Sequence, residues 1–188
     1  MPWPDDATYF RLRGWIPIPL YLGILAFLEP GPPASLEWIG GLGGLAIGLW
    51  LRARARLVMG RSSDTRRLHA KRLVTDGPYR FVRNPIYLGN WAMAMGAALL
   101  AGAWVYAPVL GGLLALHYLR VIRAEERNLE QTFPDEYPDY RRRVPRLVPR
   151  LAPEGWRRAL QPLQREVRIV AWATLAAALL ILLRIALA

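Results

Sequence analysis

Long uncharged runs alternate with strongly basic stretches along this chain. No charged residue occurs over the 35 positions from Pro85 to Leu119, or over the 15 positions from Ile169 to Leu183. About 20 apolar residues form a helix that crosses the roughly 30 Å hydrocarbon core of a bilayer. The pattern therefore predicts an all-α membrane protein.

The longer uncharged run predicts two helices rather than one. A single helix would be about 52 Å long at about 1.5 Å per residue, far more than a bilayer requires. A break near Leu100-Ala-Gly-Ala103 gives two helices, and Pro108 is expected to kink the second. Helical spacing continues past the apolar run through Leu119, Ile122, Leu129 and Phe133, which extends the second helix as far as Pro134.

Two shorter apolar runs, residues 14–28 and 38–51, lie on either side of the Pro- and Gly-containing residues 29–37. Beside the stronger runs they are expected to form a membrane hairpin anchored by interfacial Trp15, Trp38 and Trp50. Glycines spaced by four are typical of close helix contact in lipid, and they occur here at Gly40, Gly44 and Gly48. With the last run, the chain is predicted to have five membrane segments.

The positive charge is concentrated in two regions and adds detail to this topology. The chain has 25 Lys and Arg residues and a net charge of +11, but no Lys or Arg lies in residues 14–51 or 84–119. Lys and Arg are retained in cytoplasmic loops, so residues 52–83, residues 120–167 and the N-terminus are expected on the cytoplasmic side and the C-terminus outside. This segregation argues against a nucleic-acid partner.

One membrane domain is expected over residues 1–188, with an N-terminal helical hairpin (1–51), a core (52–150) and a linker with the last helix (151–188). Cysteine is absent, which excludes thiolate nucleophiles and Cys-based metal sites. His69 and His117 have no partners at metal-ligand spacing, so no metal is expected.

Polar residues gather at the foot of the predicted hairpin of residues 85–119. The stretch GPYRFVRNPIYLGN (77–90) precedes the hairpin, and Glu125-Glu126 follows it. Antiparallel helices return both segments to the same membrane face. Adjacent residues on a helix lie about 100° apart, so one glutamate at most faces a shared site while the other supports it or meets an arginine.

Structural interpretations of the same residues stay open at this point. Glu126 could pair with Arg123 or Arg127 on its own helix. Tyr79 and Tyr87 could belong to an interfacial aromatic belt. Pro85 suits the first turn of a helix, with Asn84 positioned to cap it.

The run LVTDGPYRFVRNPIYLGN (73–90), followed by EERNLEQTFPDEYPDYRRRVP (125–145), resembles the integral-membrane methyltransferases. That group includes the isoprenylcysteine carboxyl methyltransferases and the phosphatidylethanolamine N-methyltransferases. The resemblance covers about residues 70–149. Asn84-Pro85 followed by Tyr87 and Gly89 is more similar to the phospholipid branch, and the acceptor is left open.

The resemblance implies S-adenosylmethionine at the cytoplasmic membrane boundary and a lipid-like acceptor that enters from the bilayer. It implies catalytic roles for Glu125, Glu126 and Arg83, and acceptor contacts for Arg120 and Arg123. The cofactor contacts that it implies are Lys71, Leu73, Val74, Tyr79, Asn84, Pro85, Ile86, Tyr87, Glu125, Glu126, Tyr137 and Tyr140.

Two other functions fit parts of the pattern. Membrane sterol reductases that use NADPH share a stretch similar to residues 83–89, although Asn90 stands where they often have Glu. A non-enzymatic membrane scaffold would use its basic faces to bind anionic lipid headgroups. The cofactor that the protein binds separates these alternatives from a methyltransferase.

Overall fold

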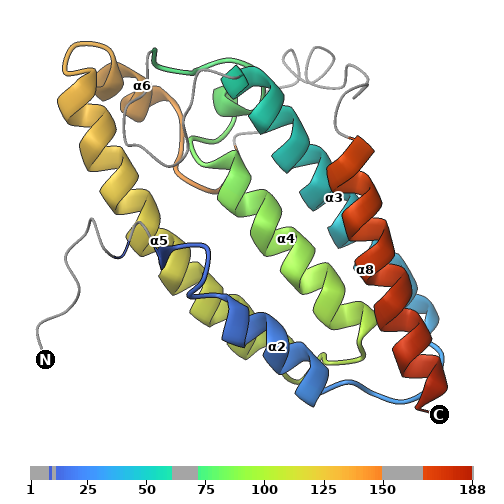
Figure 1. The fold of residues 1–188 in the computed structure, drawn as a ribbon. Coiled ribbons are helices and arrows are strands. Elements are labelled where there is room, and N and C mark those ends of the chain that lie inside the picture. The colour runs from blue at the N-terminus through green and yellow to red at the C-terminus, as the bar shows by residue number, and fades with distance from the viewer. Residues whose placement is uncertain (1–8, 10–11, 61–71, 150–166, 188) are drawn as a thin grey trace, which may run out of the picture.

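The computed structural model describes residues 9, 12–60, 72–149 and 167–187. Over these residues the chain is all-helical and contains no strand, in agreement with the predicted fold class. Figure 1 shows α4 between α3 and α5, with α8 beside α3 and α2 crossing α5. The elements are α2 (Ile18–Ala26), α3 (Ser35–Met59), the 3-10 helix η2 (Gly77–Arg80), α4 (Pro85–Leu100), α5 (Ala107–Thr132), α6 (Tyr137–Arg143) and α8 (Val167–Ala186).

The predicted hairpin is confirmed as α4 and α5. Helix α4 ends at Leu100, and the chain turns through Gly102, whose φ of +71° favours glycine. Helix α5 continues to Thr132, as the helical spacing predicted. The predicted kink at Pro108 is wrong, because α5 begins at Ala107 and the proline lies in its first turn, where no N–H is needed.

The N-terminal segments differ from the expected lengths. Helix α2 covers only Ile18–Ala26 within residues 14–28, since Pro17 and Pro19 restrict the chain at its start. Helix α3 is longer than residues 38–51 and continues to Met59. Arginine favours helix, so the basic residues at 52, 54 and 56 extend α3 instead of ending it.

Helices α3 and α4 cross at very short distance through glycines on both helices. A Cβ atom at Gly48 would lie 2.5 Å from the Gly89 carbonyl oxygen, and one at Gly96 would lie 2.6 Å from the Gly41 oxygen. The predicted close contact is confirmed at Gly44 and Gly48, whereas a Cβ atom at Gly40 would lie 3.1 Å from the Leu99 side chain instead of backbone, and Gly41 is an additional member. Only glycine allows the two backbones to approach this closely.

At the end of the bundle away from η2, Arg184 of α8 joins three other parts of the chain. We call it the Arg184 cluster: Arg184 Nε donates to the Glu29 carbonyl at 2.7 Å, and Nη1 donates to Glu37 Oε2 at 2.8 Å and to the Leu100 carbonyl at 3.0 Å. The arginine is only 3% exposed. The cluster therefore attaches α8 to the ends of α3 and α4.

Within the residues described, no helix combines the length and the apolar character needed to cross a membrane. The five-segment topology and its sidedness stay predictions. The domain boundaries at 51 and 150 also stay predictions, and residues 150–166 lie outside the described part.

Candidate active site

The stretch 77–90 forms a tight turn that leads into a helix. Gly77 has a φ of +58° and begins η2, and Pro85 is the first residue of α4. Asn84 occupies the N-cap position, but its side chain makes no capping hydrogen bond, so that expectation is wrong. Its amide donates instead to Glu126 Oε1 at 3.4 Å and to the Arg146 carbonyl at 3.3 Å.

Glu126 is the centre of a buried ionic cluster, which we call the Glu126 cluster (Glu126, Arg83, Asn84 and Arg146). Its carboxylate lies 3.0 Å from Arg83 Nη2 and 2.6 Å from Arg146 Nη2, and the residue is 6% exposed. Its partners therefore include Arg83 and Arg146 from other segments, so the pairing is not confined to Arg123 or Arg127 on its own helix. Buried carboxylates of this kind require such compensation, because removing an ion from water is costly.

Helix α6 and the residues after it close over this cluster. The Tyr140 hydroxyl donates to the Tyr79 carbonyl at 2.8 Å, and the Arg83 amide donates to the Pro145 carbonyl at 2.9 Å. Burial raises the pKa of Tyr137 to about 12, so this phenol stays neutral. We call the Glu126 cluster and the residues that cover it the wall. Tyr137 and Tyr140 pack against Leu73 and form its outer side.

A cavity of about 1080 Å³ lies in front of this wall, between α4, α5, α3 and the chain before α2. Seven of the residues predicted for the site line it: Tyr79, Arg83, Asn84, Pro85, Ile86, Tyr87 and Glu125. The other predicted residues of the described part do not line it: Leu73, Val74, Arg120, Arg123, Glu126, Tyr137 and Tyr140. Lys71 lies outside the described residues.

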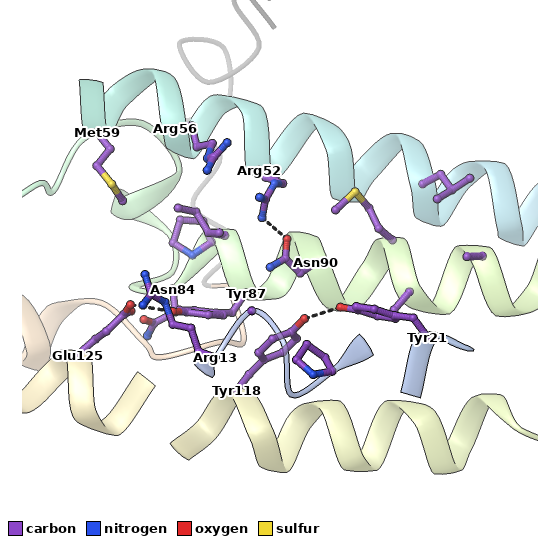
Figure 2. A pocket seen from close by; sticks show the side chains of 18 of the residues that line it. Arg13, Tyr21, Arg52, Arg56, Met59, Asn84, Tyr87, Asn90, Tyr118 and Glu125 are labelled. Atoms are coloured by element: carbon purple, nitrogen blue, oxygen red, sulfur yellow. Dashed lines mark hydrogen bonds between the residues drawn. The ribbon is translucent and has the colours of Figure 1, made fainter. Parts of the chain in front are cut away.

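Glu125 and Tyr87 form the polar centre of the cavity (Figure 2). The Tyr87 hydroxyl donates to Glu125 Oε1 at 2.7 Å. Burial raises the pKa of the Glu125 carboxyl, while the Tyr87 hydrogen bond and the Arg13 guanidinium partly offset that effect. The two glutamates thus face different environments, as their adjacent positions on a helix predicted.

Arg13 is a site residue that the sequence analysis missed. It lines the cavity near Glu125 and Tyr87. His117 holds the backbone there: its Nε2 lies 3.0 Å from the Arg13 carbonyl oxygen, and its Nδ1 lies 2.7 Å from the Tyr9 hydroxyl. Because a carbonyl only accepts, Nε2 carries the proton and Tyr9 donates to Nδ1. Arg13 and His117 are more than 100 positions apart, so no local sequence pattern could have placed Arg13 in the site.

Polar residues from four helices line the middle of the cavity and were also missed. Arg52 of α3 donates to Asn90 Oδ1 of α4, and the hydroxyls of Tyr21 and Tyr118 are 2.9 Å apart (Figure 2). Arg56 lines the cavity one helical turn beyond Arg52. The four-residue spacing of these arginines on the extended α3 is the signal that could have found them.

Apart from Asn128, the remainder of the described cavity lining is apolar. Its lining residues come from α2, α3, α4 and α8 and include Ile24, Leu45, Met93, Ala94, Ala97, Leu100 and Leu180. The cavity therefore joins a charged, tyrosine-lined region to an apolar region within the helical bundle.

The arginines expected to contact an acceptor lie elsewhere. The Arg120 guanidinium lies 4.2 Å from the centroid of the Tyr9 ring, and Arg123 is exposed on α5. No group of three or more metal-ligating side chains occurs among the described residues.

The family model of phospholipid methyltransferases matches residues 36–136, more than half of the chain. The chain belongs to the phospholipid methyltransferase family. The resemblance found on the two sequence blocks is thereby confirmed. The family match includes η2, α4, α5 and both glutamates of the site.

Three curated relatives extend the comparison. The chain is 35% identical over 112 residues to a protein-S-isoprenylcysteine O-methyltransferase of Schizosaccharomyces pombe, covering 57% of this chain and 48% of that protein. It is 40% identical over 70 residues to the nickel-cobalt-cadmium resistance protein NccN of Alcaligenes xylosoxydans xylosoxydans, covering 37% and 32%. It is 35% identical over 88 residues to the cobalt-zinc-cadmium resistance protein CzcN of Cupriavidus metallidurans, covering 47% and 37%.

The chain thus spans about half or less of the length of these relatives. No solved structure matches it.

Proposed function

We propose that this protein transfers a methyl group from S-adenosylmethionine to a lipid-like acceptor. The observation that carries the proposal is the composition of the cavity, where Glu125 and Tyr87 at one end are continuous with an apolar region between the helices. Membership in a methyltransferase family supports the reaction type. The match to an isoprenylcysteine O-methyltransferase supports an apolar acceptor.

The residues of the polar end suit this cofactor. Tyrosine faces and a carboxylate attract cations, and Tyr79, Tyr87 and Glu125 all line the same wall. A pocket for one drug-sized ligand has a volume of roughly 300–1,000 Å³. The cavity of about 1080 Å³ is large enough to leave space for an acceptor beside the cofactor.

When bound, S-adenosylmethionine supplies an electrophilic methyl group on a positively charged sulfur. The protein residues provide binding, alignment and exclusion of water, which are the main requirements of an in-line displacement. Glu126 fixes Arg83 and Asn84 at the cavity wall without lining the cavity itself, so Glu126 is a positioning residue. For an amine acceptor, Glu125 would accept the proton, since its raised pKa makes it a stronger base than an ordinary carboxylate.

The proposal includes a membrane setting, with the site on the cytoplasmic side. Large apolar side chains on the outer faces of the bundle support it: Leu36, Ile39, Ile47, Val109, Leu116, Leu179 and Leu182 are exposed. Exposed apolar surface of this extent is typical of a membrane or partner interface. A reporter fused to the C-terminus tests the sidedness, and a cytoplasmic reporter would contradict the predicted topology.

Calorimetric titration of the purified protein in detergent tests the cofactor. We expect S-adenosylmethionine to bind and Glu125→Gln to weaken binding at least tenfold. Glu136→Gln is the matched control, because Glu136 is an exposed carboxylate that does not line the cavity. Binding of NADPH instead of S-adenosylmethionine would favour the reductase alternative.

A further inference from the structure

The middle of the cavity contains a cationic site between its polar and apolar ends. From the N-cap residue Asn84 along α4, the lining residues run in order through Tyr87 and Asn90 to Leu100. Asn90 lies one helical turn from Tyr87. The apolar lining continues for ten more residues, about 15 Å at 1.5 Å per residue. A ligand group at Asn90 therefore lies between the proposed cofactor region and an apolar channel.

Arg52 is held in this position by the protein. Its Nη1 donates to Asn90 Oδ1 (Figure 2). The Asn90 amide oxygen therefore holds the guanidinium at the cavity wall. The hydroxyls of Tyr118 and of Tyr21 of α2, which also line the cavity, are 2.9 Å apart. A guanidinium has five donors in a planar fork that matches the oxygens of a carboxylate or a phosphate.

The charge of the cavity also favours an anion. The arginines that line it in the described part of the chain are Arg13, Arg52, Arg56 and Arg83, and Glu125 is the one acidic residue of that lining. Arg83 pairs with Glu126, which also pairs with Arg146. Arginines thus outnumber carboxylates in this lining, and a cationic cofactor beside Glu125 would add further positive charge.

We propose that Arg52, oriented by Asn90, binds an oxyanion on the acceptor, either a carboxylate or a phosphate, while the acceptor's apolar chain occupies the channel along α4. This inference rests on the proposed function only where it identifies the ligand as the methyl acceptor, because the subsite and its ligand chemistry follow from the cavity. It replaces Arg120 and Arg123, which do not line the cavity, as the acceptor contacts.

Binding of amphiphiles with one common tail tests the subsite without any catalytic assay. Oleate, oleoyl lysophosphatidate, oleyl alcohol and oleylamine are titrated calorimetrically into the full chain in neutral detergent, in mildly alkaline buffer that ionises oleate. We expect one or both anions to bind at least about tenfold more tightly than the alcohol, since hydrogen bonds to charged groups contribute about 1.5–3 kcal/mol. The relative affinity of oleate and lysophosphatidate distinguishes carboxylate from phosphate.

Substitutions test whether Arg52 is responsible for the preference for anionic amphiphiles. Arg52→Gln is expected to reduce anion affinity to that of the alcohol, and Arg52→Lys to restore part of it. Arg123→Gln, an exposed arginine outside the cavity, is the control and leaves the preference unchanged. Binding of S-adenosylhomocysteine to the Arg52→Gln protein, expected within twofold of wild type, shows that the variant is folded.

Equal affinity of wild-type protein for anions and alcohol would overturn the subsite, as would an anion preference that survives in folded Arg52→Gln. Should Arg52→Gln fail to fold, Arg52→Lys decides, because unchanged anion affinity in that variant would also overturn the role of the guanidinium fork. Failure of the proposed function has a different signature, since wild-type protein would bind neither S-adenosylmethionine nor S-adenosylhomocysteine while its anion preference persisted.

Discussion

The two ends of the helical bundle both contain a buried charge, but of opposite sign and with different surroundings. At one end the carboxylate of Glu126 accepts from two arginines and Asn84. At the other end the guanidinium of Arg184 donates to Glu37 and to two backbone carbonyls. Each charge joins segments that are distant in sequence, because several helix ends and loops meet at one point.

The difference between them lies in what each cluster borders. The Glu126 cluster forms the back of a wall whose front contains Glu125 and Tyr87. The Arg184 cluster does not line the cavity, although Leu100, one of its backbone partners, does so from the apolar end. The comparison indicates that both clusters stabilise the bundle, whereas only the first also determines the shape of a ligand site.

Glu126→Gln is expected to produce the largest effect. Removal of the charge leaves Arg83 and Arg146 without their buried partner, which costs about 3–5 kcal/mol of unfolding free energy. Denaturant or thermal unfolding in detergent measures the loss. Glu130→Gln is the control, because Glu130 is an exposed partner of Arg141 and its replacement should cost less than about 0.5 kcal/mol. Equal stability of the two variants would contradict the role of the Glu126 cluster.

Arg184→Met should have a smaller effect on stability and none on the site. The substitution removes the Arg184 donor from the Glu29 and Leu100 carbonyls and the charged partner of Glu37, whose Oε2 still accepts from the Ala34 N–H, at a cost of about 2 kcal/mol. Binding of S-adenosylmethionine should stay within twofold of wild type. A tenfold loss of binding in a folded variant would mean that the two ends are coupled. It would contradict the conclusion that only the Glu126 cluster determines the shape of the ligand site.

Glu125→Gln should have the opposite effect to Arg184→Met, with weaker cofactor binding and little change in stability. The unfolding free energy should change little, since the amide retains the shape of the side chain and loses the penalty of burying a charge. S-adenosylmethionine should bind about tenfold more weakly, equivalent to about 1.4 kcal/mol. Calorimetry and unfolding of the same sample measure both quantities. Loss of stability with unchanged binding would instead assign Glu125 a structural role.

The pH dependence of stability should show the smallest effect. Burial raises the pKa of Glu125 above its ordinary value of 4.5, so the folded protein binds this proton more tightly than the unfolded chain does. The contribution to stability is therefore greatest below the ordinary pKa and decreases as pH rises toward the folded pKa. The difference between wild type and Glu125→Gln, measured across this range, isolates the effect. A difference that grows in the opposite direction would mean that Arg13 and Tyr87 outweigh burial.

Much of the fold follows from local patterns in the sequence. The 35-residue uncharged run is too long for one helix, and the observed hairpin of α4 and α5 breaks within it as predicted. The glycines at 44 and 48 indicated close packing before any partner was known, and α4 supplies that partner. The lengths of α2 and α3 were harder to predict, since apolar character and helix boundaries do not coincide: prolines shorten one helix and arginines extend the other.

The site was only partly predictable. The adjacency of Glu125 and Glu126 implied different roles, but the sequence did not assign them, because both residues have the same chemistry and the same local context. The return of residues 141–146 places Arg146 at Glu126 and leaves Glu125 facing Tyr87. Arg13 and Arg52 were missed because their positions depend on how distant helices pack.

The sequence by itself determined the helical class, the central hairpin, the family and the two segments that meet at the site. Periodicity, charge distribution and motif spacing are local properties of the chain, so they can be recognised without coordinates. Only the tertiary structure decided which glutamate faces the cavity, which arginines line it and how α8 is attached. These outcomes depend on contacts between residues dozens of positions apart, where packing geometry and the cost of burying charge select one arrangement.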